Sequence, residues 1–121
     1  MNGAELIYKE RNRQLRDEGW TPQHDDAHSG GELSRAAECY VVAAQTAMVR
    51  DDAARYHKVF GADQAADGPG DEGWWKPSND PIRNLVKAGA LIAAEIDRLQ
   101  RAEEERKHQR AVSGADFGER A

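Results

Sequence analysis

Residues with chemical potential gather in one short stretch, "DEGWTPQHDDAHSGGEL", which spans residues 17–33 between two helical patterns. His24, Asp25, Asp26 and His28 fall close together and could supply nitrogen and oxygen ligands to a divalent metal ion. The same residue types are typical of turns, where their side chains bond nearby backbone and cap the next helix. Because no signature spacing selects a metal, we predict no metal site and expect these residues to form half of a ligand-binding site.

The tryptophans are the second unusual feature, because Trp20, Trp74 and Trp75 all lie in predicted connectors rather than on periodic helical faces. Trp20 could instead plug the core over the start of the second helix. Trp74 and Trp75 should either fold back on the helices or cover a pocket. Indole rings beside cations and helix N-termini are what a planar, negatively charged ligand requires.

Cations cluster where the last helix should begin. Lys76, Arg83 and Lys87 oppose the helix macrodipole there, and an anionic ligand would remove that conflict. The alternative is that the two lysines pair with surface carboxylates such as Glu72 or Asp80. The predicted ligand-binding residues are therefore Trp20, His24, Asp25, Asp26, His28, Trp74, Trp75, Lys76, Arg83, Asn84 and Lys87.

Helical patterns account for the elements that position these residues. The first covers residues 4–18, with Gly19 as a C-terminal glycine. Ser29 and Glu32 have capping-box spacing ahead of a periodic apolar run that reaches Met48. A short further helix could start at Asp51 or Asp52 and end at Gly61, followed by a Gly-, Pro- and Trp-containing connector over residues 61–79.

The last helix should start at Asp80-Pro81, with the aspartate as the N-cap. Gly89 within this helix suggests the close approach of another backbone. Residues 100–112 are charged all round and predict a solvated extension, and residues 113–121 should be a disordered tail, so residues 1–112 form a single helical domain. Apolar residues recur at spacings of three and four, which indicates a seam with a partner helix, at Ile82, Leu85, Gly89, Ile92, Ile96 and Leu99.

Composition limits the class of protein. Of 121 residues only 39% are hydrophobic, and the mean hydropathy is −0.88. We therefore expect an all-α helical bundle completed by homo-oligomerisation, as a homodimer or a larger assembly. The net charge of −5 argues against duplex nucleic acid as a partner. The single Cys39 and the lack of an apolar run predict a cytoplasmic protein without membrane contact.

Two segments carry a family resemblance and cover nearly half of the chain. They read "ERNRQLRDEGWTPQHDDAHSGGELSRAAECY" and "WWKPSNDPIRNLVKAGALIAAEIDRL". In this pattern the chain resembles a set of small, mostly uncharacterised phage and prophage proteins. That resemblance implies a viral or prophage origin and supplies no activity.

The arrangement is more distantly similar to the MazG-like nucleoside triphosphate pyrophosphohydrolases, which hold magnesium with carboxylates on facing helices. Glu32 matches one such position, but Arg35 stands where the partner glutamate belongs. The last helix presents Arg83, Asn84 and Lys87 where that family needs acids. This exchange implies loss of magnesium with phosphate binding retained. A short "EGWT" and "DD" segment also resembles the ryanodine-receptor repeat, a module associated with nucleotide-derived ligands.

The function we predict is non-catalytic binding of a nucleotide-derived anion, without a cofactor, which would sequester a signalling nucleotide of host defence in the host cytoplasm. One alternative is a divergent MazG-like diphosphatase that uses magnesium with Glu32, Glu38, Asp25 and Asp26. Another is an inhibitor that binds a host protein through Trp74 and Trp75 as aromatic anchors.

Overall fold

The computed structural model describes residues 1–48 and 74–120. Within these residues the chain forms helices α1 (Gly3–Asp17), α2 (Pro22–Asp26), α3 (Glu32–Met48) and α6 (Pro81–Arg120), and no strand. The all-α prediction is therefore confirmed for this part of the chain. The helix expected after Asp51 and most of the connector expected over residues 61–79 lie outside the described residues. None of the described helices combines the length and apolar character that a membrane span requires.

Local capping explains where α1 begins and ends. The Asn2 side chain accepts a hydrogen bond from the Glu5 backbone N–H at 2.9 Å, and the Glu5 side chain accepts one from the Asn2 N–H at 3.3 Å. This capping box satisfies two backbone donors that the first turn of a helix leaves unpaired. At the other end Gly19 adopts a positive φ of 73°, as the sequence predicts for a C-terminal glycine.

The connector between α1 and α3 contains the short helix α2. Thr21 accepts a hydrogen bond from the His24 backbone N–H at 3.2 Å, and Pro22 occupies the first helical position. The expected capping box at Ser29 and Glu32 is wrong, because Glu32 is itself the first residue of α3. Gly31, with a φ of 87°, makes the turn immediately before it, a conformation that glycine adopts without strain.

Helix α6 begins as predicted. Asp80 Oδ1 accepts a hydrogen bond from the Ile82 backbone N–H at 3.0 Å, and Pro81 is the first helical residue. The 40 residues of α6 correspond to a length of about 60 Å. The helix continues past residue 112, where a disordered tail was expected, and ends at Arg120. Residues 104–114 are exposed on every side.

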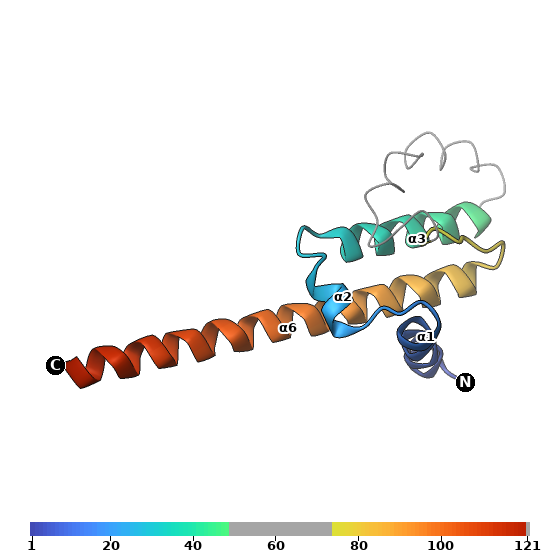
Figure 1. The fold of residues 1–121 in the computed structure, drawn as a ribbon. Coiled ribbons are helices and arrows are strands. Elements are labelled where there is room, and N and C mark those ends of the chain that lie inside the picture. The colour runs from blue at the N-terminus through green and yellow to red at the C-terminus, as the bar shows by residue number, and fades with distance from the viewer. Residues whose placement is uncertain (49–73, 121) are drawn as a thin grey trace.

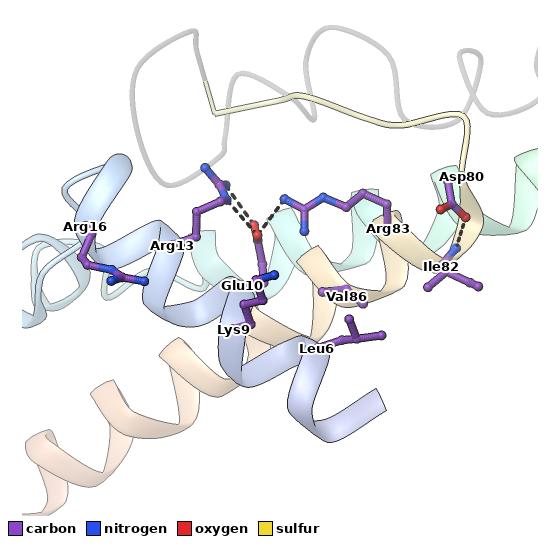
Figure 2. A pocket seen from close by; sticks show the side chains of 9 residues that line it. All are labelled: Leu6, Lys9, Glu10, Arg13, Arg16, Asp80, Ile82, Arg83 and Val86. Carbon is purple, nitrogen blue, oxygen red and sulfur yellow. Dashed lines mark hydrogen bonds and ion pairs between the residues drawn. The ribbon is translucent and has the colours of Figure 1, made fainter. Parts of the chain in front are cut away.

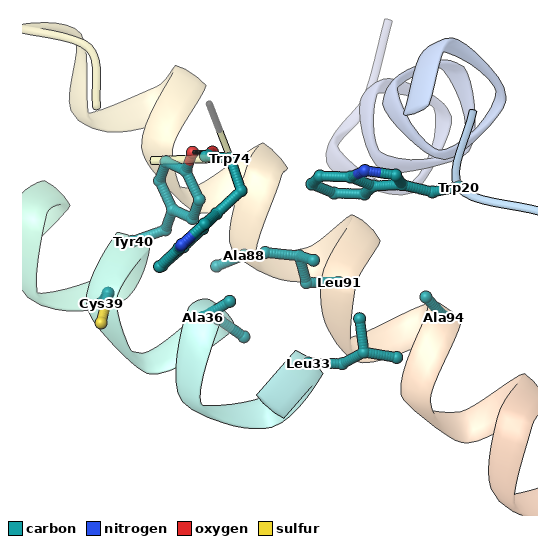
Figure 3. Packing of buried hydrophobic residues seen from close by; sticks show 10 residues of the cluster. Trp20, Leu33, Ala36, Cys39, Tyr40, Trp74, Ala88, Leu91 and Ala94 are labelled. Atoms are coloured by element: carbon teal, nitrogen blue, oxygen red, sulfur yellow. Dashed lines mark hydrogen bonds between the residues drawn. The ribbon is translucent and has the colours of Figure 1, made fainter. Parts of the chain in front are cut away.

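Helices α3 and α6 run side by side in opposite directions, and α1 crosses the first part of α6 on another side (Figure 1). The second half of α6 projects beyond this bundle (Figure 1). Between α3 and α6 the buried side chains are mostly alanines around Leu33 and Leu91, which allows the two backbones to lie close together. Tyr40, Trp20 and Trp74 complete this core from above the helix pair (Figure 3).

Candidate functional site

The structure places the predicted ligand-binding residues in two groups, one around α2 and one at the start of α6. Asp26 in the α2 group pairs with Arg101 of α6 at 2.8 Å. Arg101 follows Arg83 by 18 residues, which is about 27 Å along a helix. Asp26 and Arg83 therefore lie far apart, whereas Trp20 and Trp74 of the same two segments belong to one core cluster.

The α2 group forms a bonded structural unit. The Asp25 side chain has no exposed surface, accepts a hydrogen bond from Arg11 at 2.8 Å, and lies 3.0 Å from His24 Nδ1. The His24 ring stacks on buried Trp20, with their centroids 5.8 Å apart and their planes 4° apart. His28 Nδ1 lies 2.8 Å from the His24 carbonyl oxygen. These contacts hold α2 against α1, so Trp20 belongs to the core and Asp25 is already paired.

In the second group Tyr40 organises the segment before α6. Its hydroxyl donates to the Trp74 carbonyl oxygen at 2.8 Å and accepts from the Lys76 backbone N–H at 2.9 Å. Trp74 is only 6% exposed, and the half-buried Trp75 lies with its ring centroid 4.8 Å from that of Tyr40. Lys87 donates to the Lys76 carbonyl oxygen at 2.5 Å and lies 5.5 Å from the Tyr40 ring centroid. These indoles and this ammonium group therefore have packing roles.

The Asn84 side chain is fully buried and makes two hydrogen bonds to the backbone of Ser78. Its Oδ1 accepts from the Ser78 backbone N–H at 2.8 Å, and its Nδ2 donates to the Ser78 carbonyl oxygen at 2.7 Å. These two hydrogen bonds fix the chain just before α6. Burial, reinforced by the neighbouring Arg83, lowers the pKa of Lys87 from its ordinary value.

Arg83 does have a carboxylate partner, which corrects the premise that this cation awaits an external anion. Its guanidinium donates to Glu10 Oε1 at 2.7 Å, and Arg13 donates to both Glu10 oxygens at 2.8 and 2.9 Å. The Glu10 side chain is 1% exposed. Burial alone raises the pKa of Glu10, but hydrogen bonds and charge from Arg13 and Arg83 outweigh it, and the net pKa lies below 4.5.

A pocket of about 470 Å³ lies beside this carboxylate, between α1 and the start of α6 (Figure 2). We call it the α1–α6 pocket. Leu6, Ile82 and Val86 form an apolar part of its wall. The charged part of the lining is Lys9, Glu10, Arg13, Arg16, Asp80 and Arg83.

The charge of the α1–α6 pocket is opposite to that of the whole chain. Four cationic and two anionic side chains line it, whereas the chain carries a net charge of −5. Both anions are already engaged: Glu10 binds two guanidiniums, and Asp80 caps α6. Lys9 and Arg16 are exposed and carry no ion pair within the described part of the chain. An anion in the pocket would therefore meet two cations that have no carboxylate partner there, although Arg16 Nε donates to the Asn12 carbonyl oxygen at 3.4 Å.

Sequence reasoning found Arg83 but missed the α1 side of this pocket. Lys9, Arg13 and Arg16 recur at intervals of four and three, so a single face of α1 presents all three cations. That stripe was visible in the sequence. Its neighbour across the pocket was not, because Glu10 and Arg83 are 73 residues apart in the chain.

Two carboxylates of the diphosphatase alternative have arginine neighbours. Asp25 is buried against Arg11, and Glu32 lies 3.8 Å from Arg35. Over residues 1–48 and 74–120 no three His, Cys, Asp or Glu side chains are grouped so that they could hold a metal ion.

Comparison of the chain with protein-family models, with curated proteins and with solved structures finds no match.

Proposed function

We propose that this protein binds a small phosphate-bearing molecule of the nucleotide type in the α1–α6 pocket and does not turn it over. The observation that carries the proposal is an excess of cationic side chains around a pocket of about 470 Å³ in a chain of negative net charge. Ligand pockets for small molecules have volumes of roughly 300–1,000 Å³. A site of this size accommodates a mononucleotide-sized ligand.

The lining divides into two parts that match the two parts of such a ligand. Leu6, Ile82 and Val86 offer apolar surface to a base or sugar. Lys9 and Arg16 offer exposed cations, and a guanidinium presents two parallel N–H groups to phosphate oxygens. If the chain is phage-encoded, as its resemblance implies, binding without turnover would serve to sequester a nucleotide signal.

Calorimetric titration with inorganic phosphate, AMP and ATP, each without magnesium, tests this proposal. Lys9→Ala and Arg16→Ala should each weaken AMP binding about fivefold, because one exposed charge near a phosphate contributes about 1 kcal/mol. Lys107→Ala removes the same charge from the distal part of α6 and should leave binding unchanged. Absence of binding at millimolar concentration, or equal loss in all three variants, would refute the pocket.

Turnover is tested separately with the same nucleotides and magnesium. The binder model expects no pyrophosphate or phosphate release above that of a heat-denatured sample. Sustained release that follows protein concentration would favour the diphosphatase alternative. In that case carboxylates such as Glu32 and Glu38, rather than Lys9 and Arg16, would be the residues to substitute next.

A further inference from the structure

Large apolar side chains form an exposed line along one face of α6. Each is between 43% and 61% exposed, although each is Ile or Leu. The first and last of these residues are 17 positions apart, which is about 26 Å along the helix. We call this set the α6 stripe, and its members are Ile82, Leu85, Ile92, Ile96 and Leu99.

The α6 stripe lies beside the faces that α6 turns toward its own chain, and α1 meets one edge of it. Ala88, Leu91 and Ala94 are buried in the core on the α3 side. Gly89, the small residue within the line, is met by α1: a Cβ built there would lie 2.5 Å from Ile7 Cδ1. The close neighbour expected at Gly89 is thus a side chain and not a backbone. Ile7 is half-buried and extends the apolar surface at that level.

We propose that the α6 stripe pairs with the α6 stripe of a second copy of this chain in antiparallel orientation. With Gly89 included, the line has spacings of three, four, three, four and three residues, and the series reads the same in both directions. A reversed copy therefore places Ile82 opposite Leu99 and Leu85 opposite Ile96. Two-fold symmetric dimers require a surface that complements itself in this way.

Charge beyond Leu99 selects the antiparallel orientation. The same spacing continues through Glu103, Arg106 and Arg110. A parallel pair in register would set each of these charges opposite its own copy, which is destabilising. The antiparallel pair instead carries this segment past the start of the second copy's α6.

The proposed dimer reaches the α1–α6 pocket, because Ile82 belongs both to the α6 stripe and to the wall of that pocket. Leu99 of the second copy would lie beside Ile82 and help to close that side of the pocket. The pairing stands on the exposed stripe alone and does not require a ligand, so failure of nucleotide binding would leave it intact.

The oligomeric state tests the pairing directly. Light scattering during gel filtration should give twice the chain mass of 13.4 kDa. Ile96→Lys should give a monomer with the far-ultraviolet circular dichroism of a helical protein. Val112→Lys is the matched control, since Val112 is 48% exposed on the same helix but about 160° around it from Ile96, and it should remain dimeric. A wild-type particle of any other mass, or a dimer that survives Ile96→Lys, would overturn the proposal.

Disulfide trapping tests the orientation in a Cys39→Ala background, which removes the only native thiol. The chain with both Ile82→Cys and Leu99→Cys should form a covalent dimer on mild oxidation, because bridged cysteines need Cα atoms within about 7 Å. Leu99→Cys alone should stay uncrosslinked, since its two copies would be about 26 Å apart. Rapid crosslinking of Leu99→Cys alone would overturn the antiparallel arrangement.

Discussion

Replacing Glu10 by glutamine should destabilise the fold and yet tighten anion binding. Glu10 is a buried carboxylate that holds Arg13 through two hydrogen bonds and Arg83 through one. Glutamine keeps the volume but removes the charge, and its amide nitrogen faces guanidinium donors. The Arg83 guanidinium, and the part of the Arg13 guanidinium that does not bind Glu18, then become available to a ligand in the α1–α6 pocket. One negative charge has also been removed from that pocket.

The size of the stability loss follows from how exposed the partners are. Breaking a fully buried ion pair costs about 3–5 kcal/mol, and an exposed pair contributes at most about 1 kcal/mol. The Arg13 and Arg83 side chains are 34% and 38% exposed, so water can rehydrate both. We therefore expect a loss of about 2 kcal/mol, which lowers Tm by roughly 6–10 °C for a chain of this length.

The gain in affinity comes from Coulomb repulsion that the variant no longer has. A carboxylate a few ångströms from a phosphate costs about 1–4 kcal/mol, depending on how much water screens the pair. Tightening of AMP binding by about tenfold is therefore expected in calorimetry. Glu18→Gln is the control, because Glu18 also pairs with Arg13, at 3.2 Å, but does not line the pocket. The Glu18→Gln variant should have a lower Tm and an unchanged affinity for AMP.

Acid unfolding provides an independent measurement of the same carboxylate. The folded-state pKa of Glu10 lies below its ordinary value, so its contribution to stability is present above about pH 4.5 and is lost as pH falls through the folded pKa. Glu10→Gln should flatten this acid limb of the curve of stability against pH.

If the Glu10→Gln variant binds AMP no better than wild type, Arg83 and Arg13 do not contact the ligand and the proposed site is wrong.

Three further substitutions test the packing that surrounds the pocket. Gly89→Ala should lower the free energy of unfolding by about 1–2 kcal/mol because its Cβ meets Ile7, and Ile7→Ala in the same chain should recover part of that loss in a denaturant double-mutant cycle. Tyr40→Phe should lower the free energy of unfolding by about 1–3 kcal/mol, because it removes the hydroxyl that bridges two backbone groups. The change in tryptophan emission on unfolding should then occur at a lower denaturant concentration. Burial raises the pKa of Tyr40 to about 12, so wild type should also lose stability as pH rises from 10 to 12, and the phenylalanine variant should not. Asn84→Ala should lower the free energy of unfolding by about 2–3 kcal/mol, because it removes both hydrogen bonds to Ser78. The affinity for AMP, measured below the unfolding transition, should be unchanged. A loss of affinity in the folded variant would show that Asn84 contributes to the binding site.

The helix boundaries that the sequence predicted correctly depend on local chemistry. Asp80 and Pro81 specify the start of α6 with side-chain and ring geometry that acts within two residues. Ser29 and Glu32 offered the same kind of signal and failed, because Gly31 takes a positive φ next to the helix and moves its start forward. Local patterns are reliable only where no glycine competes for the turn.

The candidate site was less predictable because its contacts are long-range. The charged and aromatic residues around α2 looked like a binding site when read alone. Their partners, such as Arg11 for Asp25, lie 14 residues away on α1. Glu10 reaches Arg83 across 73 residues. A single sequence shows which residues can pair and does not show which of them do.

Side-chain size is unevenly distributed around α6. Its α3-facing side buries mainly alanines, whereas the five large residues of the α6 stripe remain about half exposed. Full burial of one such side chain contributes about 1.5–3 kcal/mol, so roughly 4–7 kcal/mol per copy is not realised. That amount is comparable with the whole stability of an ordinary domain, about 5–15 kcal/mol. The proposed pairing of two α6 stripes would bury these side chains and recover that free energy.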